Sequence, residues 1–305
     1  MTIWDAIILG ILQGLTEFLP ISSSAHLRIA GEFLPAATDP GATFTAITQI
    51  GTEIAVVIYF WRDITGILGA WFRHTFRPTT RQALGPRERN QVRLGWLIIL
   101  GTLPIVAVGY TAQSVIRDTF RSLWLVATVL IVFALVLLAA DYWGRKTRTL
   151  DTLSVPHGVA YGLAQTLALI PGVSRSGATI SMGLALGYTR VEATRFAFLL
   201  AIPAVFGSGL FELNTAVFNP AEAGPLDPLA TVVATVVALV VGYGVIAWLM
   251  RFLTTRSFLP FVIYRLVLGG GRPCARRAAL LPRVRGLLAR HQHAVQRGRA
   301  ARGCA

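Results

Sequence analysis

Long apolar stretches dominate the chain and determine the expected fold. Five of them approach the roughly 20 residues that a helix needs to cross a bilayer. These stretches are residues 43–61, 95–113, 122–140, 194–213 and 229–250. Only 14% of the 305 residues are charged, against about 25% in ordinary soluble domains. The pattern predicts an all-α integral membrane protein, a polytopic bundle that passes the bilayer several times.

Two shorter apolar segments do not fit this pattern. "QGLTEFLPISSSAHL" (13–27) and "AQTLALIPGVSRSGATI" (164–180) are each interrupted by proline and small polar residues. We interpret both as re-entrant helix–loop–helix hairpins, one from each face of the membrane. Irregular backbone at membrane depth is tolerated only where it is buried in protein or lines a wet cavity. A matched pair of such interruptions therefore predicts a binding site.

A comparison of the chain with itself indicates an internal repeat. Several pairs of positions share an offset of 152 residues: Gly10 and Gly162, Gln13 and Gln165, Ser22–Ala25 and Ser174–Gly177, Phe44 and Phe196, Ile50 and Ile202. Chance can produce some of these pairs, but one constant offset through two polar motifs favours duplication. We expect a single membrane domain, residues 1–269, with repeat one at about 1–143 and repeat two at about 152–269.

The charges between the apolar stretches predict how the repeats are oriented. Residues 62–94 carry seven arginines, and 144–151 and 251–256 are also basic, so these segments should be cytoplasmic. Residues 30–42 and 214–227 contain no Lys or Arg and should be external. Stretches 43–61 and 194–213 then cross in opposite directions. The two halves are predicted to be inverted-topology repeats, an architecture that many transport folds use.

The C-terminal segment, residues 270–305, differs from the rest of the chain. It holds nine arginines and no acidic residue, and the remainder has 19 basic against 14 acidic residues. The net charge of +14 is therefore no sign of nucleic-acid binding. Both cysteines lie in this tail, so the membrane domain has no cysteine metal site.

The last apolar run, Phe258 to Gly271, has 14 residues, too few to cross the bilayer. We consider two explanations: a reading-frame shift that replaced the end of a helix, and a true basic tail at the membrane surface. An apolar continuation in another frame would support the shift.

Four ionisable residues in the apolar segments need a common explanation, because each costs several kcal/mol in a membrane unless it is paired or hydrated. They are Glu17, His26, Glu53 and Arg175. Together with the serines they suit phosphate chemistry. A guanidinium can bind phosphate oxygens, a carboxylate with Gln13 can hold a divalent cation, and an imidazole can transfer protons to or from a serine nucleophile.

Each of these residues also has a purely structural interpretation. The serines can satisfy backbone groups freed by the helix breaks, and Gln13 can hydrogen-bond between helices. Glu53 and Arg175 can be structural counter-ions, and His26 can lie at the membrane interface. The recurrence of the polar set in two matching hairpins favours chemistry.

The two hairpin motifs resemble those of the undecaprenyl-diphosphatase, or bacitracin-resistance, family. The motifs are "QGLTEFLPISSSAH" (13–26) and "PGVSRSGATI" (171–180); "FLLAIPA" (198–204) and "RSFLPFVIYR" (256–265) are also similar to family sequence. The resemblance covers about residues 1–268. It implies hydrolysis of undecaprenyl (polyprenyl) diphosphate to the monophosphate and inorganic phosphate. This reaction recycles the lipid carrier for peptidoglycan synthesis in the bacterial cytoplasmic (inner) membrane. The resemblance also implies a divalent cation, Mg²⁺ or Ca²⁺, and a site open to the external face.

The resemblance assigns roles to individual motif positions. The implied catalytic residues are Glu17, Ser23, His26 and Arg175, with His26 as general acid/base and Glu17 and Gln13 at the metal. The implied substrate-binding residues are Gln13, Ser22, Ser24, Ser174, Ser176, Gly177 and Thr179. The family motif accepts Glu or Gln at its first position, so Gln13 leaves one carboxylate fewer. Attack by a serine and direct attack by water both remain open.

Two other functions are alternatives to the phosphatase. A transporter or flippase of polyprenyl phosphate, or of another anionic lipid, would use the same inverted halves and the same anion pocket. A purely structural subunit does not explain the buried ionisable residues. The expected partners are the lipid substrate and membrane lipid, with no nucleic acid; the sequence leaves the oligomeric state open, a homodimer included.

Overall fold

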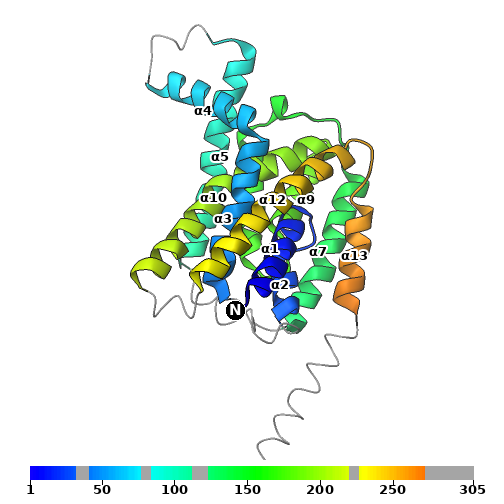
Figure 1. Ribbon diagram of the computed structural model, residues 1–305. Helices are drawn as coiled ribbons and strands as arrows, with labels where there is room; N and C mark the ends of the chain where they lie inside the picture. The colour runs from blue at the N-terminus through cyan, green and yellow to red at the C-terminus, as the bar shows by residue number, and fades with distance from the viewer. Residues whose placement is uncertain (32–40, 77–83, 112–122, 220–226, 272–305) are drawn as a thin grey trace, which may run out of the picture.

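The computed structural model describes residues 1–31, 41–76, 84–111, 123–219 and 227–271, and its regular elements in these ranges are all helices (Figure 1). The elements are α1 (Ile3–Phe18), α2 (Ser23–Gly31), α3 (Gly41–Tyr59), α4 (Trp61–Phe76), α5 (Pro86–Thr111), α7 (Leu123–Trp143), η2 (Leu150–Thr152), α8 (Val155–Thr166), η3 (Leu167–Leu169), α9 (Arg175–Ala185), α10 (Arg190–Phe218), α12 (Pro228–Phe252) and α13 (Leu259–Gly270). The prediction of an all-α protein is confirmed.

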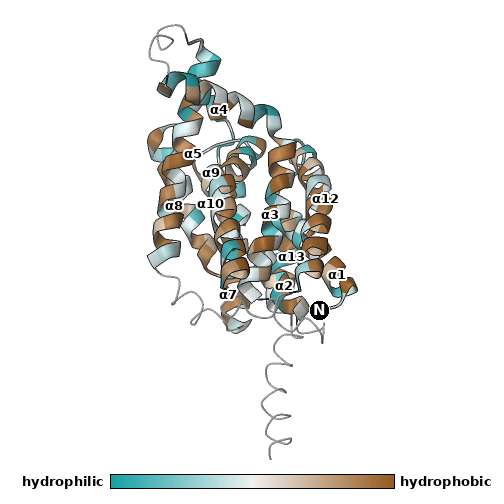
Figure 2. Cartoon of the chain, turned by 60° about the vertical axis from the view of Figure 1, so that its left-hand side comes forward, coloured by the Kyte–Doolittle hydropathy of each residue, from teal (hydrophilic) through white to brown (hydrophobic). Residues whose placement is uncertain are grey.

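The long apolar stretches become helices of membrane-spanning length. Within the described ranges, α5, α7, α10 and α12 are each long and apolar enough to cross a bilayer, whereas α3 and α4 pass the same test only as a pair, with a bend of 79° between them. Each of the five predicted stretches falls on one of these helices. Figure 2 shows apolar residues along the long helices and hydrophilic residues gathered near α4. Large apolar side chains such as Trp124, Leu135 and Val240 are exposed, as expected of surfaces that face lipid. The chain is a polytopic membrane protein.

The basic stretch 62–94 is more regular than its charge suggests. It contains α4 and the first turns of α5. Helix α4 is amphipathic: Ile67 and Ala70 are buried, whereas Arg62 and Arg73 are exposed. The charge count of this stretch obscured its helical period.

Contacts at both ends of α3 show how it lies against α10. Near the start of α3, the Thr43 hydroxyl donates a hydrogen bond to Glu212, which lies late in α10. Beyond the end of α3, Asp63 forms an ion pair with Arg195, which lies early in α10. The two helices are therefore antiparallel, as the loop charges predict.

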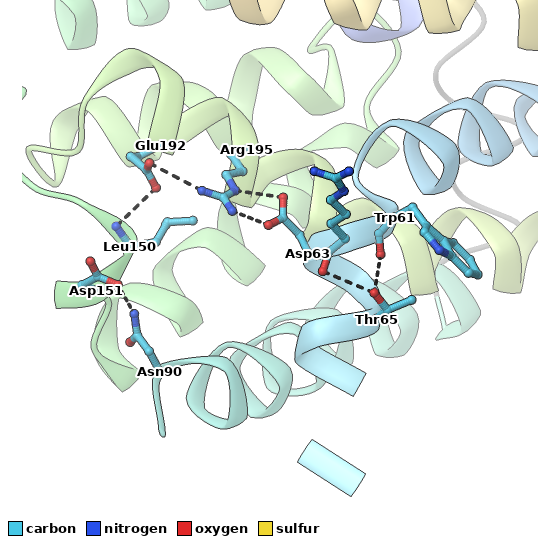
Figure 3. A network of polar contacts seen from close by, with 9 residues as sticks. Trp61, Asp63, Thr65, Asn90, Leu150, Asp151, Glu192 and Arg195 are labelled. Carbon is cyan, nitrogen blue, oxygen red and sulfur yellow. Dashed lines mark hydrogen bonds and ion pairs between the residues drawn. The ribbon is translucent and has the colours of Figure 1, made fainter. Parts of the chain in front are cut away.

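A polar network fixes the end of the molecule where α4, α5 and α10 begin (Figure 3). Arg195 donates to Asp63 and lies 3.8 Å from Glu192. Glu192 accepts a hydrogen bond from the backbone N–H of Leu150, and the neighbouring Asp151 accepts one from Asn90. This end carries the basic segments that the positive-inside rule places in the cytoplasm.

The two proline-interrupted segments enter the bundle from opposite ends. Helix α1 runs parallel to α12, because Gly10 lies against Ala234 and Gly14 against Ala238. Helix α8 runs parallel to α5, because Gly158 lies against Leu97 and Gly162 against Gly101. Helix α12 runs in the same direction as α3, and α5 runs in the same direction as α10. Because α3 and α10 are antiparallel, α1 and α8 point in opposite directions. The close contacts require glycine: a Cβ at Gly10 would lie 2.6 Å from the Ala234 carbonyl oxygen.

The duplication itself stays a prediction, although the hairpins match in detail. Helices α1 and α8 begin 152 residues apart, at Ile3 and Val155, and α2 and α9 begin 152 residues apart, at Ser23 and Arg175. The predicted domain boundary near 269 coincides with the end of α13 at Gly270. Of the predicted tail, residues 272–305 lie outside the described residues.

Candidate active site

Each hairpin turns at a serine with unusual backbone geometry. Leu19 leaves the helix before Pro20, and Ile170 does the same before Pro171, because the residue before a proline disfavours the helical conformation. Ser22 and Ser174 then adopt positive φ angles of 74° and 71°. Such a conformation costs a non-glycine residue about 1–3 kcal/mol and is concentrated at functional sites.

The carboxylate of Glu17 lies at the centre of the first hairpin. It accepts hydrogen bonds from Ser23 Oγ at 2.6 Å and from Gln13 Nε2 at 2.9 Å. Gln49 Nε2, from α3, lies 3.3 Å from the same carboxylate oxygen. The predicted group of Glu17, Gln13 and Ser23 is therefore assembled, with Gln49 as an additional member.

A second carboxylate lies on α3, one turn beyond Gln49. Glu53 is buried, and its Oε1 has no hydrogen-bond partner among the described residues. It lies on the same face of α3 as Gln49, whose amide contacts Glu17. The membrane-embedded acid singled out from the sequence thus belongs to the same site as the two hairpins.

Arg175 contributes the positive charge of the site. It is the first residue of α9, where the helix dipole also favours an anion. Its Nε and Nη1 atoms are shielded from solvent and have no hydrogen-bond partner in the described part of the chain. A shielded guanidinium without a partner is suited to binding a phosphate group of a ligand.

The serines connect the two hairpins. Ser22 and Ser24 hydroxyls lie 3.1 Å apart, and so do those of Ser174 and Ser176. Ser176 Oγ also donates to the backbone carbonyls of Glu17 and Leu19, both at 3.3 Å. The second hairpin is therefore fastened directly to the end of α1.

Two further predicted binding residues have structural contacts. The Thr179 hydroxyl is buried and donates to the Arg175 carbonyl at 2.8 Å. The Gly177 N–H donates to Ser174 Oγ, which caps α9. Their contact with substrate stays a prediction, as do the substrate contacts of the serines.

His26, in α2 of the first hairpin, is buried and does not contact the Ser23 hydroxyl. Its Nδ1 lies 2.7 Å from the Ser22 carbonyl oxygen, and its Nε2 lies 2.7 Å from the Tyr264 hydroxyl. Because a carbonyl oxygen only accepts, Nδ1 carries the hydrogen, and in the neutral ring Nε2 accepts from Tyr264. The group in contact with Ser23 is Glu17.

Three residues near the site received no role from the sequence: Gln49, Tyr264 and Arg265. Gln49 is four residues before Glu53, a spacing that places both on one face of a helix. Arg265 is an ionisable residue in an apolar run, which is itself a functional signal in membrane proteins. Tyr264 carries no comparable signal, since tyrosines are common at helix ends in membranes.

Three side chains of the site carry the kind of oxygen ligand that a hard divalent cation takes. The donors are the carboxylates of Glu17 and Glu53 and the amide of Gln13. Both Gln13 Oε1 and Glu53 Oε1 are shielded and lack partners among the described residues. No group of three or more His, Cys, Asp or Glu residues suited to a metal occurs in the part of the chain described. Mg²⁺ is commonly held by one or two carboxylates together with substrate phosphates, so such a group is not required.

Comparisons with known proteins show which family this chain is similar to. Residues 6–271 match the family described as "Bacitracin resistance protein BacA". The chain is 61% identical over 270 residues to an undecaprenyl-diphosphatase of Micrococcus luteus, covering 88% of this chain and 95% of that protein. It is 57% identical over 267 residues to one of Paenarthrobacter aurescens, covering 87% and 94%. It is 53% identical over 265 residues to undecaprenyl-diphosphatase 2 of Agrobacterium fabrum, covering 87% and 92%. The resemblance found in the two hairpin motifs is confirmed, and the chain belongs to the BacA family of bacitracin resistance proteins.

Proposed function

We propose that this protein hydrolyses undecaprenyl diphosphate to undecaprenyl phosphate and inorganic phosphate in the bacterial cytoplasmic membrane. Family membership and relatives named undecaprenyl-diphosphatase support this activity. The product is the lipid carrier of peptidoglycan synthesis, and its recycling accounts for the family's description as bacitracin resistance proteins.

The hydrogen bond from Ser23 to Glu17 carries the chemical part of the proposal. A carboxylate 2.6 Å from a hydroxyl is within reach to take its proton as the oxygen attacks. The partnerless guanidinium of Arg175 supplies the positive charge that a diphosphate needs. Ser176 holds the hairpins that bear these groups together.

In the proposed reaction, Ser23 Oγ attacks the terminal phosphorus while Glu17 accepts the hydroxyl proton. The bond from that phosphorus to the bridging oxygen breaks, and undecaprenyl phosphate leaves with the electron pair. A water molecule then hydrolyses the phosphoserine, which releases phosphate and restores Ser23. In the alternative route a water bound to Glu17 attacks directly. Glu17 accepts the proton in both routes, and a Ser23→Ala protein with near-normal turnover would select the second.

We assign His26 to proton transfer through its contact with Tyr264. Its Nδ1 is occupied by a backbone carbonyl, so only Nε2 can exchange a proton. The Tyr264 hydroxyl is the group at that nitrogen.

A divalent cation, Mg²⁺ or Ca²⁺, would be held by Glu17, Glu53 and Gln13 together with substrate. When bound it would neutralise charge on the diphosphate. Arg175, which lies in the second hairpin, would bind oxygen atoms of the substrate diphosphate. The fork of a guanidinium can orient two of them at once.

Phosphate release from undecaprenyl diphosphate in detergent tests the proposal. No transport can occur there, so release of phosphate separates the phosphatase from a lipid transporter, which the comparisons do not favour. We expect release by the purified protein and its loss on addition of a chelator. Purified, folded protein that releases no phosphate with Mg²⁺ or Ca²⁺ present would contradict the proposal.

A further inference from the structure

Arg265, in α13, is the largest fully buried side chain of the described residues. A guanidinium at membrane depth is expensive unless it is paired or fully hydrogen-bonded. No ion pair joins it to a carboxylate in the described ranges. Its charge must be stabilised in another way.

Four backbone carbonyls bind this guanidinium. Nε donates to the Leu130 carbonyl of α7 at 3.1 Å, and Nη1 donates to the Pro20 carbonyl at 3.0 Å. Nη2 donates to the carbonyls of Gly172 and Val173 at 2.9 and 3.2 Å. Arg265 therefore uses four of its five N–H donors on backbone alone.

Three of these four carbonyls, those of Pro20, Gly172 and Val173, belong to the breaks in the two hairpins. Pro20 lies between α1 and α2, and Gly172 and Val173 lie between η3 and α9. Carbonyls at a helix break have lost their intrahelical partners and need new donors. Pro20 and Gly172 are also 152 residues apart, so one side chain binds the equivalent position of each turn.

We propose that Arg265 is a positioning residue that sets the separation of the two halves of the active site. Ser23 follows Pro20 by three residues, and Arg175 follows Val173 by two. Arg265 acts on both through the backbone of the turns, because its hydrogen bonds go to backbone carbonyls and not to either side chain. The expected effect of Arg265 on catalysis rests on the proposed function.

Two neighbouring contacts agree with this role. Tyr264, the residue before Arg265, holds His26, so α13 contacts the first hairpin twice. A Cβ added at Gly177 would lie 3.0 Å from Arg265 Nη1. The second hairpin is thus packed closely around the guanidinium.

Substitution of Arg265 tests the proposal through kcat/KM and, independently of the folded fraction, through KM and an inhibition constant. We expect Arg265→Met to lower kcat/KM about 100-fold, since a displacement of about 1 Å can have this effect. We also expect it to raise KM and to weaken inhibition by methylene diphosphonate, because Arg175 moves with its turn. Arg265→Lys keeps the charge but not the planar fork, and should recover part of the loss. Exposed Arg251→Met is the matched control and should behave as wild type.

A milder variant keeps the test valid if Arg265→Met does not fold. Gly177→Ala should displace the guanidinium slightly and raise KM and the inhibition constant, whereas Gly244→Ala, with open space at its Cβ, should not. Hydrogen exchange of residues 19–24 and 170–177 should rise in both turns in Arg265→Lys.

Unchanged KM and inhibition in the folded variants, or faster exchange in only one turn, would overturn the positioning role. If the wild-type protein released no phosphate, the proposed function would fail, while the exchange measurement would still decide whether Arg265 holds both turns.

Discussion

The two hairpins share a backbone plan but carry different chemistry. Both turn at a serine with positive φ, and α2 and α9 begin at equivalent positions. The first residue of α2 is Ser23, bound to Glu17, and the first residue of α9 is Arg175, without a partner among the described residues. The position equivalent to Glu17 is Leu169. One hairpin thus provides the hydroxyl and its base, and the other provides the positive charge.

The difference shows how two similar turns can make one site. Ser176 and Arg265 join them by donating to backbone carbonyls, so these contacts do not require the side chains of Ser23 or Arg175. The two turns can therefore carry different side chains at corresponding positions without loss of these contacts. Exchanging or removing these side chains tests whether the two hairpins have different roles.

Exchange of the two equivalent residues should have the largest effect. In a Ser23→Arg, Arg175→Ser protein, the second hairpin has Leu169 at the position that corresponds to Glu17, so the new serine has no equivalent carboxylate, and the new arginine can pair with Glu17. We expect kcat to fall about 10⁴-fold, which is close to the loss seen when one residue is removed from a set of catalytic residues that act together. The measurement is phosphate release by detergent-purified protein. Activity within tenfold of wild type would show that the hairpins are interchangeable.

Replacement of Arg175 by lysine should have the next largest effect. Lysine keeps the charge but cannot bind two phosphate oxygens with a planar fork. We expect kcat/KM to fall about 100-fold, in the range for loss of one transition-state donor. Steady-state kinetics over a range of substrate concentrations measure the loss. The exposed Arg256→Lys protein is the matched control, and equal kinetics of the two variants would contradict the role of Arg175.

The paired glutamines should show the smallest effect and the clearest contrast. Gln13 donates to Glu17, whereas neither polar atom of buried Gln165 has a partner among the described residues. Gln13→Leu should lower kcat about tenfold, which corresponds to the loss of one hydrogen bond to a charged group.

Gln165→Leu should leave kcat unchanged and keep or raise the melting temperature, because an apolar side chain has no unsatisfied polar atoms. Phosphate release and thermal unfolding measure both variants. A tenfold loss of activity in Gln165→Leu would show that the second hairpin also contributes through its glutamine.

Most of the fold could be predicted from the sequence, because membrane-spanning helices are marked by length and hydropathy. The five long stretches, the two broken segments and the short final helix are all present. Helix α4 was missed because it is short and charged. Its burial of Ile67 depends on tertiary contacts that no local pattern contains.

The candidate site was predictable in its residue types but only partly in its contacts. The motif positions of Glu17 and Ser23 are six residues apart and meet because the chain turns at Pro20. The pairing of His26 with Tyr264 joins residues 238 positions apart, and nothing in either segment indicates it. The fork of Arg265 onto two turns is likewise visible only in three dimensions.

The turnover of Glu17→Gln protein tests the central claim most directly. Glutamine keeps the size of the side chain but cannot accept the proton of the Ser23 hydroxyl or of a water. At saturating undecaprenyl diphosphate in detergent, we expect kcat at least about 100-fold below wild type. The melting temperature, measured by thermal unfolding, should be the same as that of the wild type. Glu88→Gln, at a half-buried carboxylate that pairs with Arg73 outside the site, should keep full activity. A folded Glu17→Gln protein that releases phosphate at the wild-type rate would contradict the account.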